Sequence, residues 1–180
     1  MEKKIIGLCL YLFAVSATAT VVTFDDVATD IPTPFVSGGL LFSGETGETF
    51  AWNTTGSSSD NGTQALAIGF GSAVTVTRDG GGLFSLDSLD AGLSWYTALS
   101  SFEVNVGSET ITLGIGYSTY SFTSLTNISS LTITPGPTDG YIAIDNINWS
   151  DSSAVPEPGS LVLLGLGLAG FGFSRKNKSA

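Results

Sequence analysis

The chain has 180 residues, a length that suggests one domain of ordinary size once the terminal segments are set aside. Six Lys and Arg stand against sixteen Asp and Glu, giving a net charge of −10, and this disfavours nucleic acid as a partner because phosphate backbones bind clustered basic side chains. The sequence has no histidine, which excludes mechanisms built on imidazole, including Ser-His-Asp triads and His-ligated zinc.

The first segment has the order of a secretory signal peptide. Two lysines precede an uncharged apolar run at residues 5–15, and small residues follow at positions 16–19. Eleven apolar residues would span about 16 Å as a helix, which is too short for a bilayer core of about 30 Å. We therefore expect signal peptidase to remove residues 1–19. The single cysteine, Cys9, lies in this leader, so the mature chain would have neither a disulfide nor a thiol nucleophile.

The segment 20–153 is predicted to be an all-β domain. Short runs rich in β-branched and aromatic residues alternate with turns that contain Gly, Asn, Asp and Pro. In several runs apolar and polar residues alternate, which is typical of antiparallel sheets with one wet face. The pattern favours an antiparallel two-sheet β-sandwich, and the most helix-like stretch, residues 85–98, is short and contains Gly92. The expected strands are Val21–Phe24, Leu40–Phe42, Phe50–Trp52, Ala65–Phe70, Val74–Arg78, Leu83–Leu86, Ser101–Val106, Thr110–Ile115, Ser118–Phe122, Leu131–Thr134 and Tyr141–Trp149.

Acidic residues dominate this domain. Between Thr20 and Ala154 there are fourteen acids and one base, Arg78, which leaves a local charge of 1 − 14 = −13. Salt bridges cannot satisfy so many carboxylates. We expect them to remain in water, to bind a cation, or both.

A short motif opens the C-terminal tail, which we place at residues 154–180. Its stem, residues 155–159, contains Pro156, Glu157 and Pro158. Proline has no amide donor and disfavours helix in the residue before it, so we expect an extended and accessible stem.

An uncharged segment follows the stem at residues 160–174, and a basic tail at residues 175–180 closes the sequence. Counted from Gly159, sixteen residues would reach about 24 Å as a membrane helix, so bilayer thinning and snorkelling must cover the rest of a core of about 30 Å. The basic side chains should remain in the cytoplasm, which places the domain outside. These membrane-flanking residues are Arg175, Lys176 and Lys178.

This layout closely resembles the PEP-CTERM sorting tail of Gram-negative bacteria that make exopolysaccharide. The resemblance rests on residues 156–158, the apolar segment and the basic end, in that order and paired with a signal peptide. It implies a precursor anchored in the inner membrane, which an exosortase-type membrane protease cuts near the motif before the protein reaches the cell surface or the extracellular matrix. Asn177 departs from the arginine-rich tail that is common in the family. The alternative is a C-terminal anchor that no enzyme cuts.

Three patterns in the domain look like the jelly-roll modules of the galactose-binding-like superfamily, which includes many carbohydrate-binding modules. The patterns lie at residues 24–26, 60–66 and 141–147. The resemblance implies a structural calcium ion held by Asp25 and Asp145, with backbone carbonyls from the middle segment. Calcium takes six to eight oxygen ligands, and an acidic domain offers them. Solvated strand-end carboxylates are the alternative interpretation of the same two residues.

Aromatic side chains in the domain suggest sugar binding. Flat rings stack on sugar faces, and carboxylates accept hydrogen bonds from sugar hydroxyls. The candidates are Trp52, Trp95 and Tyr96. Paired carboxylates could in principle hydrolyse a glycoside, but Asp87, Asp90 and Glu103 have the spacing of ordinary surface residues.

The sequence therefore favours an exported, non-enzymatic surface or matrix protein that is sorted through its C-terminal signal. The alternative is a secreted carbohydrate-binding module that recognises an exopolysaccharide. The expected partners are signal peptidase, the exosortase-type protease, the inner membrane before processing and, in the second case, a polysaccharide. Apart from calcium, we expect no cofactor.

Overall fold

Twelve β-strands and no helix make up the secondary structure of the described residues. The computed structural model describes residues 19–44, 48–55, 57–69, 71–94, 101–136 and 140–152, which belong to a compact unit spanning Ala17–Ser153. No helix in this part of the chain is long and apolar enough to cross a membrane. The expected leader, the sorting motif and the membrane segment with its basic end lie outside the described residues, except for Ala19.

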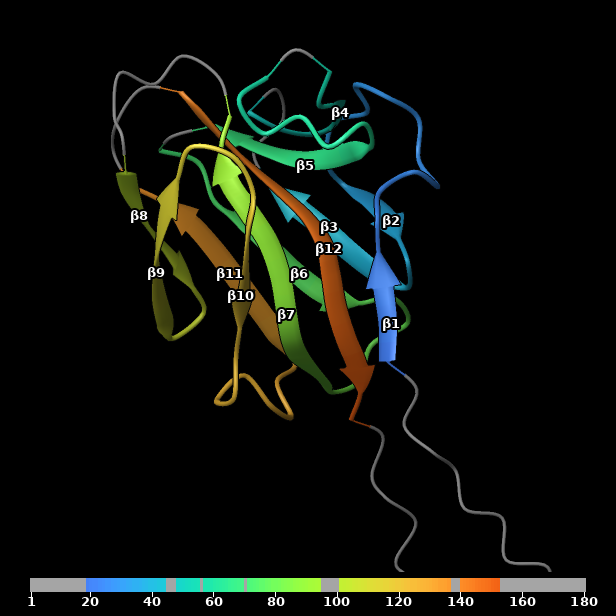
Figure 1. Cartoon of the computed structure of the whole chain (residues 1–180). Helices are drawn as coiled ribbons and strands as arrows, with labels where there is room; N and C mark the ends of the chain where they lie inside the picture. Colours follow the sequence, from blue (N-terminus) through green and yellow to red (C-terminus); the bar gives the residue numbers. More distant parts are fainter. Residues whose placement is uncertain are drawn as a thin grey trace, which may run out of the picture. The chain divides into compact units, whose positions relative to one another are not determined.

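The strands form two antiparallel sheets of six (Figure 1). Sheet A has the order β10-β7-β12-β5-β4, and β1 adds to β12. Its strands are β1 (Ala19–Val22), β4 (Thr49–Asn53), β5 (Gln64–Gly69), β7 (Phe84–Leu93), β10 (Ser118–Ser121) and β12 (Tyr141–Asp151). Sheet B has the order β2-β3-β6-β11-β8-β9. Its strands are β2 (Phe35–Ser37), β3 (Leu40–Gly44), β6 (Val74–Arg78), β8 (Ser101–Val106), β9 (Glu109–Gly114) and β11 (Ser130–Pro135).

The core lies between the inner faces of the two sheets, and β3, β6 and β11 bury alternate residues there. Three phenylalanines pack at the end near β2: the rings of Phe24 and Phe42 are 5.1 Å apart, and Phe35 stacks on Phe42 at 5.5 Å. Trp149 packs edge-on against Phe84, with ring centroids 6.2 Å apart, and its Nε1 donates to Gly38 O at 3.1 Å. Burial of these side chains supplies the main driving force for folding.

The expected two-sheet, jelly-roll type of β-sandwich is confirmed, and most strands lie where the sequence predicts them. The short strand β2 was not predicted. The expected strand Leu83–Leu86 is too short, because β7 continues to Leu93 through the stretch with the most helix-like pattern. Pairing of β7 with β10 and β12 overrides the weak local preference there.

The first and last described strands are neighbours. Ala19 of β1 pairs with Ser150 of β12, and Val22 pairs with Ile147. β12 also pairs with β7 along most of its length, so its C-terminal half has a neighbour on both sides (Figure 1). Arg78 of sheet B forms an ion pair of 2.6 Å with Asp151 at the end of β12.

Candidate functional site

The loop between β4 and β5, which we call the strap, comprises residues 54–63, of which the structure describes all but residue 56. It lies against the outer face of sheet A. The hydroxyls of Ser58 and Ser59 donate to Leu93 O on β7, at 2.6 and 2.7 Å. A side chain at Gly92 would collide with Gly116 O and with the Ser59 hydroxyl, so the close approach of the strap requires glycine here. The strap therefore rests directly on the backbone of β7.

Asp145 of β12 is fully buried beneath the strap. Its Oδ2 accepts hydrogen bonds from Asn61 Nδ2 at 2.8 Å and from Thr63 Oγ1 at 2.9 Å, and its Oδ1 accepts from the backbone N–H of Asn146 at 2.7 Å. Asn61 Oδ1 lies 2.7 Å from Thr63 Oγ1 and 3.2 Å from Thr54 Oγ1, so it offers the Thr63 hydroxyl a second acceptor. The carboxylate thus fastens the strap to the sheet through side chains 82 and 84 residues away in sequence.

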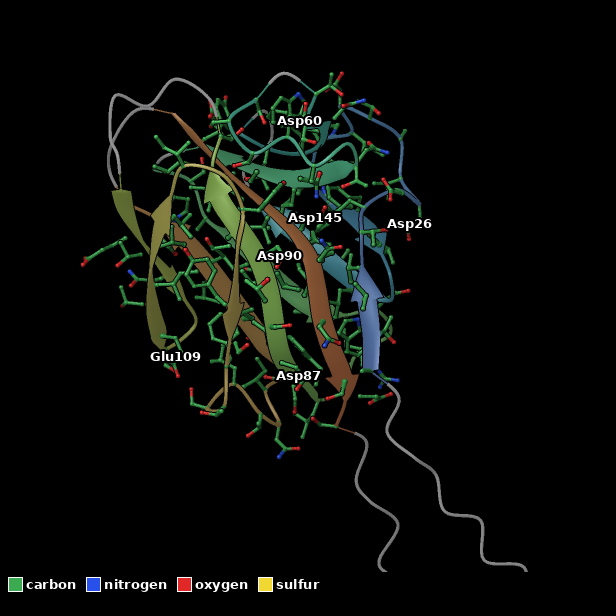
Figure 2. The ribbon with its side chains drawn as sticks, viewed as in Figure 1. Asp26, Asp60, Asp87, Asp90, Glu109 and Asp145 are labelled. Atoms are coloured by element: carbon green, nitrogen blue, oxygen red, sulfur yellow. The ribbon has the colours of Figure 1, made fainter. Side chains whose placement is uncertain are left out.

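Other carboxylates surround Asp145. Asp90 is its direct partner on β7, and Asn146 Nδ2 and Thr119 Oγ1 donate to Asp90 at 2.9 and 2.5 Å. Figure 2 shows Asp90 and Asp145 on neighbouring strands, with Asp60 in the strap above them. Like charges directly opposite in a sheet are unfavourable, and the Asn146 amide that binds Asp90 reduces that cost.

Burial and charge shift the acidity of this cluster. Burial raises the pKa of Asp145 above 3.8, and the charge of Asp25 adds to the rise, although hydrogen bonds from Asn61, Asn146 and Thr63 act in the opposite direction. Burial also raises the pKa of Tyr117 strongly, helped by the charges of three carboxylates that include Asp145. The Tyr117 hydroxyl is buried and has no hydrogen-bond partner in the structure. The cluster is therefore rich in oxygen atoms and lacks a positive charge.

The two expected calcium ligands lie close to the same segment. Asp25 Oδ1 accepts from Gln64 N at 3.1 Å, directly after the strap residues that bind Asp145. The next residue, Asp26, instead binds Ser37 Oγ and Gly38 N, and these hydrogen bonds outweigh the effect of burial and lower its pKa. Among the described residues, no group of three or more His, Cys, Asp or Glu could hold a metal ion. A calcium site here would need backbone carbonyl and amide oxygens besides Asp25 and Asp145.

A second feature of the same face, which we call the aromatic corner, comprises Glu48, Phe50, Gly69 and Tyr141. Phe50 of β4 is opposite Ala67 of β5, and Tyr141 of β12 is opposite Gly69. The two rings meet edge to face above these small residues, with centroids 5.8 Å apart. Both rings remain partly exposed.

A carboxylate completes the corner. Glu48 is exposed, and the Tyr141 hydroxyl donates to its Oε2 over a long distance of 3.4 Å. A side chain at Gly69 would collide with the Glu48 carboxylate, so the glycine lets this group lie against the sheet. Burial raises the pKa of Tyr141, and the charge of Glu48 raises it further, which keeps the phenol neutral and able to donate.

The other residues singled out from the sequence are not brought together. Trp52 shares the outer face with Phe50, but only 8% of it is exposed. Trp95 and Tyr96 lie outside the described residues. The carboxylates considered for hydrolysis are divided between the sheets, with Asp87 and Asp90 on β7 and Glu103 on β8. The structure therefore does not assemble Glu103 with either of the other two.

Residues 154–176 match the family described as the PEP-CTERM protein-sorting motif. The chain carries a PEP-CTERM sorting signal. This match confirms the resemblance drawn from Pro156, Glu157 and Pro158 and indicates an exported protein that is sorted to the cell envelope. A comparison with curated proteins finds no match.

Solved structures similar to this chain include carbohydrate-binding modules. A family 29 module is 21% identical, with 79% of this chain and 97% of that chain covered and a TM-score of 0.45. A point mutant of the module CBM29-2, made to probe ligand recognition, is 20% identical, with 78% and 100% covered and a TM-score of 0.43. A protein from a study of the Ruminococcus flavefaciens cellulosome is 18% identical, with 76% and 95% covered and a TM-score of 0.37. At these values the comparison assigns no ligand or site residue to this chain.

Sequence reasoning missed the strap and the aromatic corner. The sequence suggests only backbone carbonyls from residues 60–66 as ligands, whereas the bonds of the Asn61 and Thr63 side chains to Asp145 depend on tertiary structure. Phe50 and Tyr141 were placed in strands, and the pairing of both strands with β5 brings their rings together. Knowledge of the strand order would have been needed to find either feature.

Proposed function

We propose that this chain is an exported, non-enzymatic surface protein whose β-sandwich is delivered to the cell surface or the extracellular matrix through its C-terminal signal. The match of residues 154–176 to the PEP-CTERM sorting motif is the observation that carries the proposal. The leader at residues 1–19 would direct export, and signal peptidase would remove it.

In the proposed route, the uncharged segment 160–174 holds the precursor in the inner membrane of a Gram-negative bacterium. The basic residues Arg175, Lys176 and Lys178 stay in the cytoplasm, which keeps the sandwich on the outer side. An exosortase-type protease then cuts near Pro156–Pro158 and releases the sandwich from its anchor.

Mass spectrometry of the protein recovered from the cell surface of an exosortase-bearing host tests this route. The wild type should lack residues 1–19 and the residues that follow the sorting motif. Replacement of Pro156, Glu157 and Pro158 by alanine should leave the tail attached, whereas the control Glu103→Ala should be processed normally. Recovery of the full-length wild type from the cytosol with both ends uncut would refute the proposal.

A structural calcium ion between the first and last strands is a further proposal. Asp25 and Asp145 would be its charged ligands, and the raised pKa of Asp145 marks a carboxylate whose charge a cation would stabilise. The bound ion would tie the loop after β1 to β12, and so would resist fraying of an edge strand.

Carbohydrate binding is the second candidate function. The observation that favours it is the aromatic corner, where partly exposed rings and a carboxylate share one face of sheet A. A glycan array probed with the protein separates this candidate from a purely structural role. Selective binding that is lost in Trp95→Ala would also place Trp95 in the site, whereas binding to no glycan would leave the structural role.

A further inference from the structure

We propose that the aromatic corner binds a sugar unit of a neutral polysaccharide, and that the domain rejects acidic polysaccharides. The inference rests on the carbohydrate-binding function proposed above. It adds a location on sheet A, formed by Glu48, Phe50 and Tyr141 around Gly69, and a charge class for the ligand.

The rings provide the stacking surface. Phe50 and Tyr141 come from strands on either side of β5 and meet over its small residues Ala67 and Gly69. Both rings retain exposed surface on the outer face of sheet A. Partly exposed aromatic rings suit a ligand with one apolar face and a polar rim, as a pyranose has.

Glu48 and the Tyr141 hydroxyl provide the polar contacts. Their mutual hydrogen bond is long, at 3.4 Å, so a sugar hydroxyl placed between them could donate to the carboxylate and accept from the phenol at better distances. The raised pKa of Tyr141 keeps that phenol protonated. The pair thus supplies an acceptor and a donor beside the stacking surface.

Charge then selects the class of polysaccharide. The segment from Thr20 to Ala154 has fourteen acids and one base. That base, Arg78, is bonded to Asp151 and to Gly81 O at the end of β6. An acidic sugar at the aromatic corner would meet the Glu48 carboxylate with no cation to balance it, whereas a neutral sugar pays no such cost.

Isothermal titration calorimetry of the full-length protein in detergent tests the inference, with EDTA present so that calcium cannot bridge carboxylates. The probes are two neutral hexasaccharides, cellohexaose and maltohexaose, and the acidic hexagalacturonate. We expect at least one neutral probe to bind at least tenfold more tightly than hexagalacturonate.

Variants locate the site. Phe50→Ala and Tyr141→Ala should each weaken neutral binding at least tenfold, whereas Tyr141→Phe, which keeps the ring, should stay within about fivefold of the wild type. Glu48→Gln should reduce the difference in affinity between the neutral probes and hexagalacturonate. The matched control Glu103→Gln removes one negative charge from sheet B and should leave that difference in affinity unchanged. Urea unfolding of each variant verifies that it is folded.

The outcomes separate this inference from the functions on which it rests. Neutral binding that survives both Phe50→Ala and Tyr141→Ala would overturn the location and leave carbohydrate binding standing. Tighter binding of hexagalacturonate than of either neutral probe would overturn the charge class. If no probe bound, the inference and the carbohydrate-binding candidate would both fail, while sorting through residues 154–176 would still be judged by mass spectrometry.

Discussion

Replacing Asp145 by alanine should destabilise the sandwich much more than replacing an exposed acid. Asp145 is 0% exposed and accepts three hydrogen bonds. Its removal leaves Asn61 Nδ2 and Asn146 N without their acceptor. Thr63 Oγ1 is spared, because it also lies 2.7 Å from Asn61 Oδ1.

The size of the effect follows from those two donors. A donor without a partner costs about 1–3 kcal/mol when it is buried, but Asn61 is exposed and Asn146 is half-buried, so water can partly replace the lost acceptor and the two together should cost about 1–3 kcal/mol. Loss of the buried charge and of its repulsion by Asp25 offsets part of this cost. We expect a net loss of about 1.5 kcal/mol in the free energy of unfolding, which for a domain of this size lowers Tm by about 5 °C.

Urea unfolding of the full-length protein in detergent, followed by tryptophan fluorescence, measures this change. The control is Asp79→Ala, which removes an exposed acid from the turn after β6. Asp145→Asn, which retains an acceptor oxygen, should fall between Asp145→Ala and the wild type. If Asp145→Ala were no less stable than the Asp79→Ala control, the reasoning that Asp145 fastens the strap would be wrong.

Three further predictions concern calcium, pH and the ion pair. EDTA should lower the Tm of the wild type, measured by calorimetry, and should not affect Asp145→Asn; identical responses would argue against calcium at Asp145. With EDTA present, stability should rise as pH falls toward about 3.8, because the raised pKa of Asp145 makes the folded chain take up this proton more readily than the unfolded chain; below about 3.8 the lowered pKa of Asp26 should reverse this trend. Urea titrations across that range check the sign, and an equal gain in Asp145→Asn would contradict the assignment. Arg78→Gln should cost less than about 1 kcal/mol, because Arg78 and Asp151 are 33% and 31% exposed, and the difference from the wild type should shrink in concentrated salt; a salt-independent loss above about 2 kcal/mol would show that the pair is more than a surface contact.

The strands with clear period-two alternation could be predicted from the sequence. Val74–Arg78 and Ser101–Val106 were placed with the bounds that the structure gives, because each alternates apolar and polar residues. β2 is only three residues long, too short to display a period. The strand predicted at Leu83–Leu86 ends too early, because Asp87, Ser88 and Gly92 have weak strand preference. A register shift opposite Asn148 also breaks the alternation of apolar and polar residues in β7.

The candidate site could be predicted only in part, for a related reason. A first-strand acid and a last-strand acid were expected to lie near residues 60–63, and the structure does bring Asp25 and Asp145 to that segment and the residue after it. Whether they bind calcium stays a prediction. The pairing of Asp90 with Asp145 and the meeting of Phe50 with Tyr141 depend on strand order, which local sequence patterns do not encode.

The position of β12 determines how the sandwich would respond to mechanical force. The stem that leads to the sorting motif follows the end of this strand in sequence, where β7 and β1 flank residues 148–150 and Arg78 forms an ion pair with Asp151. Hydrogen bonds between antiparallel strands run perpendicular to the chain, so tension along the stem loads them together in shear instead of opening them one after another. A sandwich loaded through its stem would therefore resist unfolding better than one loaded through a strand at the edge of its sheet.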